Sequence, residues 1–214
     1  MKTRMTSRKG VLTVTIAIVI GACLALLGAI AAQGLSIRTV AGSLLVLCFF
    51  VFMVGGMLFT GRAFLKWPVD GSSSHWIWER GFVIGGVLFT VLGLALLQEM
   101  LQTAGETVWS ELGAVAYLFG AVIVVAAETT FLARRDWVYS QIVLYVVLAF
   151  LAQAALGAAL LQTGLVAAWV GWATIIWNLV WLPVLLIFSP RNIYYPALHH
   201  AAPLLIGIAL LAQR

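Results

Sequence analysis

Long apolar stretches, separated by short polar or charged segments, make up almost the whole chain. Each stretch is close to the ~20 residues that an α-helix needs to cross the hydrocarbon core of a bilayer. A membrane β-barrel is a poor alternative, because its strands of ~10 residues alternate in polarity, whereas these stretches are apolar throughout. Seven stretches can be drawn, over residues 11–32, 39–60, 80–101, 112–133, 138–161, 165–188 and 194–213. The pattern predicts an all-α integral membrane protein with seven transmembrane helices in one polytopic domain, residues 1–214.

The two terminal stretches allow other interpretations. The first follows a basic segment that contains Arg8 and Lys9, and it ends in small residues, which is also typical of a secretory signal peptide. We interpret it as the first spanning helix. The last stretch contains Pro203, which interrupts helical hydrogen bonding. In a six-helix alternative, residues 194–213 would therefore lie in the membrane interface.

Composition and charge support a membrane protein and predict its orientation. The chain is 64% hydrophobic and 9% charged, whereas soluble domains carry about 25% charged residues. With a cytoplasmic N-terminus and seven crossings, the C-terminus lies outside, and all Lys and Arg residues except Arg38 and Arg214 fall on the cytoplasmic side. This bias is typical of the prokaryotic inner (cytoplasmic) membrane. The net charge of +5 is therefore a topology signal, and no soluble domain is present to bind nucleic acid.

A pattern of Phe, two further residues and Arg recurs where the inward-running helices end. Aromatic residues follow each copy. The outward-running helices share their own ending, in which a Gln follows a Gly by five or six residues. The longest cytoplasmic loop, 61–79, follows the first copy. We therefore predict an internal repeat of one helix plus three tandem hairpins, although interfacial Arg and Trp can also arise by convergence. The three copies are Phe59–Arg62, Phe131–Arg134 and Phe188–Arg191.

Glu128 is the acidic residue placed deepest in any apolar stretch, six residues before Arg134. At ~1.5 Å per residue, it lies about 9 Å from the end of its helix. An ionisable group inside a spanning helix marks a functional site by default, because its unpaired burial is costly. The alternative is a structural ion pair with Arg62 or Arg191.

His199 belongs to the cytoplasmic half of the last helix. Pro203 follows it by four residues and has no N–H to donate to the His199 carbonyl, so both that carbonyl and the ring are candidate ligands. Gln141 and Tyr145 share one helix face at a similar depth, and Asn178 lies nearer the midplane. Together with Glu128, these residues predict a polar cavity, although single polar side chains between membrane helices commonly serve packing.

Trp177 and Trp181 are one turn apart in the sixth stretch, beside Pro183. This spacing places the two indoles on one face of the helix. They form a candidate aromatic wall for an apolar ligand, with ordinary packing as the alternative.

The residues support no enzyme class and assign no catalytic residue, metal ligand or cofactor. Glu128 and His199 are the two visible zinc-ligand candidates, whereas a catalytic zinc usually has three protein ligands. Two hypotheses follow. In the first, the protein binds or moves a proton or small solute through the polar cavity. In the second, it is a structural or assembly subunit that packs within a larger membrane complex. The expected partners are the lipid bilayer and, beyond it, other membrane subunits or further copies of this chain.

Overall fold

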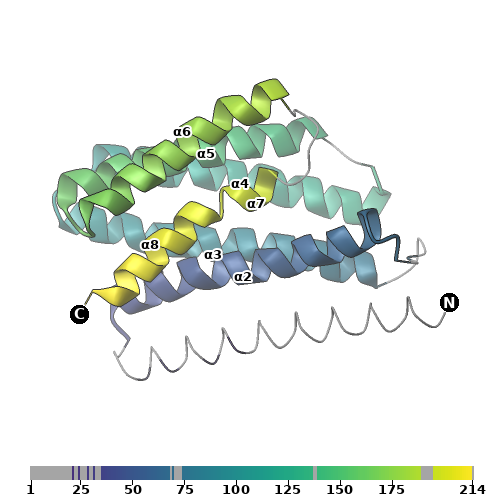
Figure 1. The fold of residues 1–214 in the computed structure, drawn as a ribbon, viewed down its shortest axis with the longest axis horizontal. Coiled ribbons are helices and arrows are strands. Elements are labelled where there is room, and N and C mark those ends of the chain that lie inside the picture. The colour runs from purple at the N-terminus through teal and green to yellow at the C-terminus, as the bar shows by residue number, and fades with distance from the viewer. Residues whose placement is uncertain are drawn as a thin grey trace.

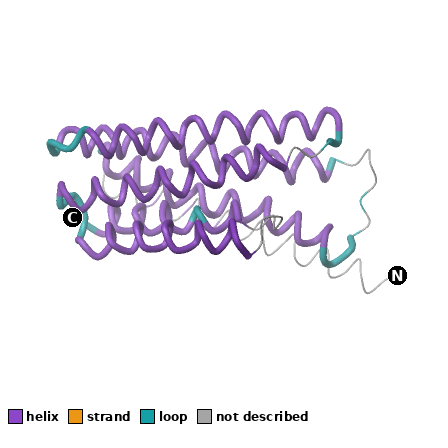
Figure 2. Tube along the Cα trace, turned by 90° about the horizontal axis from the view of Figure 1, so that it is seen from above, coloured by secondary structure: helices purple, strands orange, loops and turns teal. Residues whose placement is uncertain are grey.

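The computed structural model describes residues 21, 24, 28, 31, 35–67, 69, 74–136, 139–188 and 195–213. Within these ranges the chain is helix and connecting turn, without a strand (Figure 2). The predicted helix over 11–32 therefore lies outside the described residues, apart from four helical positions. So do Arg191 and the third copy of the proposed repeat beyond Phe188. The repeat and the single-domain organisation stay predictions.

Five of the described helices are long and apolar enough to cross a membrane. They confirm the predictions for 39–60, 80–101, 112–133, 138–161 and 165–188, and every observed bound lies within five residues of the predicted one. The five are α2 (Ile37–Ala63), α3 (His75–Thr103), α4 (Val108–Arg134), α5 (Tyr139–Thr163) and α6 (Ala168–Phe188). The all-α membrane class is thus supported by five spans.

The long helices run antiparallel to their neighbours in sequence and lie side by side along the long axis of the molecule (Figures 1 and 2). α2 packs on α3, α3 on α4, α4 on α5 and α5 on α6. α8 (Ala201–Ala212) packs mainly on α2 and also on α6, and so closes the bundle between them. One end of the bundle, here called the basic end, carries Arg62, Arg134 and Arg135.

The predicted helix over 194–213 is two helices in the structure. α7 (Tyr195–Leu198) is one turn long, His199 and His200 form a turn, and α8 follows. Pro203 lies in the first turn of α8, where a missing N–H costs no helical hydrogen bond. With 12 residues, α8 is about 18 Å long, which is too short to cross the bilayer alone. In Figure 1 the break between α7 and α8 lies part way along the bundle, between α2 and α6.

The predicted loop 61–79 is shorter in the structure, because α3 begins at His75. Trp76, Trp78 and Glu79 are therefore helical. Glu79 is fully buried, and its carboxylate bonds to two arginines. This buried ion pairing extends the helix beyond the apolar run that the sequence shows, and the turn signals in 68–74 lie mostly outside the described residues.

Glu106 lies in the turn before α4, at the opposite end of the bundle from Arg62. Its carboxylate accepts hydrogen bonds from the backbone N–H groups of Trp109 (2.7 Å) and Ser110 (2.8 Å). Burial alone would raise the pKa of Glu106, but these hydrogen bonds outweigh it and lower the pKa below its usual value. The carboxylate therefore stabilises the start of α4 above its unfolded-state pKa, and this contribution is lost as the pH falls through the lower folded-state pKa.

Glycines allow the closest approach of α2 and α8. A Cβ atom on Gly207 would lie 2.7 Å from the backbone oxygen of Gly42. Small residues of this kind let the backbones of membrane helices pack closely. Gly207→Ala should therefore destabilise the protein by about 1–3 kcal/mol, as overpacking does, which thermal unfolding in detergent would show.

Gly56 in α2 is the matched control, because a Cβ atom there would meet nothing within 4 Å. Gly56→Ala should stabilise the protein by roughly 0.5–1 kcal/mol, the usual gain from removing a helical glycine. If Gly207→Ala proves as harmless as Gly56→Ala, the close α2–α8 crossing is wrong.

Candidate functional site

The break between α7 and α8 brings two adjacent histidines into the interior of the bundle. His199 and His200 are both 0% exposed. Their neighbours come from the long helices: Phe52 from α2, Thr90 from α3, Tyr117 from α4, and Tyr145 and Phe150 from α5. Phe52 and Thr90 lie near the middle of their helices. The histidine pair is therefore at about the midplane of the predicted membrane.

His199 is bonded to two tyrosines. Its Nε2 atom is 2.8 Å from the hydroxyl oxygen of Tyr145 and 3.1 Å from that of Tyr117, and the two hydroxyl oxygens are 3.3 Å apart. Both tyrosines are at most 1% exposed. Each hydroxyl can donate one proton and also accept. The three groups form a closed triangle in which a proton can be handed between three atoms without solvent.

His200 has a different environment, and its tautomer can be inferred. The hydroxyl of Thr90 donates to the backbone oxygen of Gly86 at 2.9 Å and lies 3.3 Å from Nδ1 of His200. A hydroxyl has one proton, so Nδ1 carries the hydrogen of the second bond. Nε2 of His200 is then the unprotonated nitrogen, and it has no hydrogen-bond partner within the described part of the chain. It is a buried basic atom with an unused lone pair.

The rings of the pair contact each other at a tilt, and the ring of His200 also contacts that of Phe52 at a tilt. The ring centroids of His199 and His200 are 4.1 Å apart, and those of His200 and Phe52 are 4.2 Å apart. These contacts pack both imidazoles against neighbouring rings. We call Thr90, Tyr117, Tyr145, His199 and His200 the polar centre.

α6 supports the break through Trp177. Its indole Nε1–H donates to the carbonyl oxygen of Leu198, the last residue of α7, at 2.9 Å. This bond satisfies a carbonyl that the end of α7 leaves without a helical partner. Trp181 packs edge-to-face on Trp177, with ring centroids 5.6 Å apart. The pair predicted as an aromatic wall thus lies beside the break, where Trp177 holds it through a hydrogen bond.

Two further buried amides lie on α5 and α6, which pack on each other. Gly157 of α5 contacts Gly171 of α6. Because the helices are antiparallel, Gln153, four residues before Gly157, is offset by about 4.5 Å along the helix axis from Asn178, seven residues after Gly171. Both side chains are 0% exposed. The Nδ2 group of Asn178 donates to the backbone oxygen of Thr174 (2.7 Å), while its Oδ1 atom and both amide atoms of Gln153 lack partners among the described residues.

A second polar group of residues, the ionic layer, lies toward the basic end. Arg62, Glu79, Arg80 and Glu128 alternate in charge and sum to zero. The Nε and Nη2 atoms of Arg62 each bond to Glu79 at 3.0 Å. Arg80 donates to Glu79 at 2.6 Å and to both carboxylate oxygens of Glu128 at 3.3 and 3.1 Å. The layer ties α2 to α3 and α3 to α4.

Aromatic rings cover the ionic layer. The guanidinium of Arg62 lies 4.2 Å from the centroid of a Trp76 ring, and that of Arg80 lies 4.8 Å from the Phe131 ring. His75 adds its Nε2 atom at 3.3 Å from Glu79. Paired charges under aromatic cover are the arrangement that buried ions need. The ionic layer is therefore suited to holding α2, α3 and α4 together.

Apolar side chains separate the two polar groups. On α4, Tyr117 and Glu128 lie on one buried stripe with Ala121 and Val124 between them. Eleven residues at ~1.5 Å per residue place the two side chains about 16 Å apart along the helix. A proton or solute that crosses from one polar group to the other would therefore need water or helix movement.

The structure divides the residues predicted from the sequence. It brings His199 and Tyr145 together, and it places Asn178 in the same central part of the bundle. Glu128 instead bonds to Arg80, which is neither of the two arginines named as its alternative partner. Gln141 is only partly buried, one turn before Tyr145, and the bonds described for the polar centre do not include it.

Sequence reasoning missed Thr90 and the pairing of Glu79 with two arginines. Thr90 lies in an uninterrupted apolar run, so nothing in the sequence marks it. For Arg80 the sequence did contain a signal of a buried ion pair, because this charged residue is the first position of its predicted helix. In the described residues no three His, Cys, Asp or Glu side chains gather as metal ligands.

Comparison with known protein families, curated proteins and solved structures gives no match to this chain. The functional argument therefore rests on the geometry of the polar centre.

Proposed function

We propose that this protein binds a proton or small solute at the polar centre and moves it across the membrane. The observation that carries the proposal is the open Nε2 atom of fully buried His200, at a helix break that five long helices surround. A broken helix at the midplane is the usual way in which transporters form a binding site. Polar groups that a spanning helix buries at this depth mark function by default.

In this proposal the two histidines have different tasks. His200 offers a basic nitrogen to a proton or to a hydrogen-bond donor of the solute. His199 and its two tyrosines hold and pass a proton within their triangle. The buried amides of Gln153 and Asn178 add polar groups on α5 and α6, and the ionic layer holds the helices in register.

A structural or assembly subunit remains the second candidate. The apolar residues Ala121 and Val124 between the ionic layer and the polar centre favour it, because both are nearly fully buried. Under this alternative the polar groups only join helices.

The two candidates differ in proton movement. The purified protein in lipid vesicles that enclose a pH-sensitive dye should acidify them faster than empty vesicles when a potassium diffusion potential, inside negative, draws protons in. Acidification at the rate of empty vesicles would contradict the proposal and favour the structural subunit.

For the topology, we propose seven spans with the basic end in the cytoplasm of a prokaryotic cell. The support is the gathering of arginines at that end and the five spans already described. A cysteine placed at Ser74 should react with an impermeant thiol reagent only from the cytoplasmic side, and one at Gly105 only from outside. Reaction of both from one side would contradict this orientation.

A further inference from the structure

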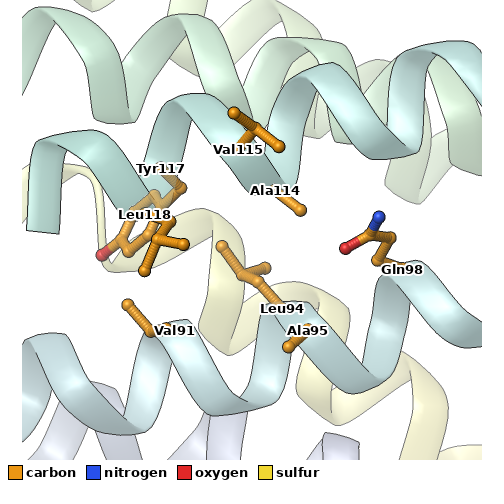
Figure 3. Close-up of a pocket in the computed structure, with 8 residues that line it drawn as sticks. All are labelled: Val91, Leu94, Ala95, Gln98, Ala114, Val115, Tyr117 and Leu118. Carbon is orange, nitrogen blue, oxygen red and sulfur yellow. The ribbon is translucent and has the colours of Figure 1, made fainter.

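A pocket of about 110 Å³ lies between α3 and α4, in the half of the bundle away from the basic end. α3 and α4 pack on each other less extensively than α2 does on α3 or α4 on α5. Figure 3 shows Tyr117 and Gln98 at the two ends of the pocket. The rest of the lining is apolar: Val91, Leu94, Ala95, Ala114, Val115 and Leu118.

This pocket opens to lipid on one side and reaches the polar centre on the other. Val115 is 44% exposed and Leu118 is 50% exposed, so the outer rim faces the surrounding hydrocarbon. The inner wall is the ring of Tyr117, and the hydroxyl of that same residue bonds to His199. A molecule in the pocket would therefore press on a side chain of the proposed transport site.

We propose that the pocket is a lateral binding site for an uncharged, membrane-dissolved amphiphile. Its hydrogen-bonding group would meet the amide of Gln98, which both donates and accepts, and its apolar body would extend toward Tyr117. A charged ligand is disfavoured because no lining residue is charged. The volume is smaller than the ~150 Å³ of an apolar cavity that takes up benzene. The pocket thus holds a chain segment or a small ring, while the rest of the ligand stays among lipids.

Binding of an amphiphile at this pocket does not depend on proton movement. A role of the pocket as the lateral entrance to the polar centre, however, rests on the proposed function. Occupancy would reach His199 through Tyr117 alone. The expected ligands or regulators at this pocket are therefore lipid-soluble alcohols or carbonyl compounds, and not ions from the aqueous phase.

The probe is a diazirine-bearing derivative of 1-decanol, added to the full chain in lipid nanodiscs and mapped by mass spectrometry. Adducts should concentrate on residues 91–98 and 114–118, and excess 1-decanol should suppress them while decanoate does not. Gln98→Leu should weaken the competition by 1-decanol about fivefold, the usual value of one neutral hydrogen bond.

Two separate substitutions fill the pocket. The test therefore still gives a result if one of the two variants fails to fold. Ala114→Phe and Ala95→Phe should each remove the adducts. Ile176→Phe, on the lipid-facing side of α6, should leave them unchanged. Adducts spread evenly over the lipid-facing side chains, as for bulk lipid, would overturn the inference even in a protein that moves protons. Concentrated adducts in a protein without proton uptake would support the pocket and refute the transport proposal alone.

Discussion

Replacing His199 with glutamine should slow proton uptake into vesicles roughly 10²-fold, the scale that a positioned acid–base group contributes. The glutamine amide reaches about as far as Nε2 of histidine, so the bonds to Tyr117 and Tyr145 can persist while the group can no longer take up a proton. His200→Asn should have a similar effect, because asparagine keeps a polar group near Nδ1 and lacks the open Nε2 atom. The measurement is the initial rate of vesicle acidification at equal protein content.

His75→Gln is the matched control for the histidine variants. It removes the third histidine of the chain, which lies at the start of α3 and outside the polar centre. Its uptake rate should equal that of the unsubstituted protein. Folded His199→Gln and His200→Asn proteins that acidify vesicles at the full rate would show that neither imidazole is needed.

Glu79→Gln should cost about 3–5 kcal/mol of stability, the range for breaking a buried ion pair. Glu79 is 0% exposed and accepts hydrogen bonds from both Arg62 and Arg80. A neutral amide there leaves two arginines, the buried Arg80 and the partly buried Arg62, with one remaining carboxylate, Glu128. Glu128→Gln should also destabilise the protein, but by less, because Glu128 is bonded to a single arginine. Thermal unfolding in detergent would measure both changes.

The control for these variants is Glu111→Gln, an exposed acid of α4 near the opposite end. It should change stability by no more than about 0.5 kcal/mol, as surface substitutions usually do. The double variant Arg80→Met with Glu128→Leu should be more stable than Glu128→Gln, because apolar side chains can replace a buried pair. Unfolding of Glu79→Gln at the temperature of the unsubstituted protein would show that the ionic layer does not hold the bundle.

The long spans could be predicted from the sequence because their signal is strong. About 20 consecutive apolar residues leave the backbone in lipid no alternative to a helix. The ends were less predictable where a buried ion pair, as at Glu79, extends the helix into a polar segment. The break at His199–His200 was indicated by Pro203, but its place in the middle of the bundle depends on packing against α2 and α6.

The site was only partly predictable, because depth along a helix can be counted but partners cannot. Residue counts place Glu128 and His199 in the same half of the membrane, and so predict one cavity for both. The helix break moves His199 toward the midplane, and Arg80 holds Glu128 in the ionic layer. Thr90 bonds to His200, which lies 110 positions later in the sequence, and no local pattern encodes such a contact.

The polar centre is tested most directly by the protonation of its imidazoles in a bilayer. The chain has three histidines, so ¹⁵N-labelled imidazole signals in nanodiscs can be assigned with single substitutions. The account predicts that Nε2 of His200 carries no proton at neutral pH and takes one up reversibly as the pH is lowered, while the protein stays folded. An unchanged neutral spectrum of both His199 and His200, down to the pH at which the protein unfolds, would contradict a proton-binding site.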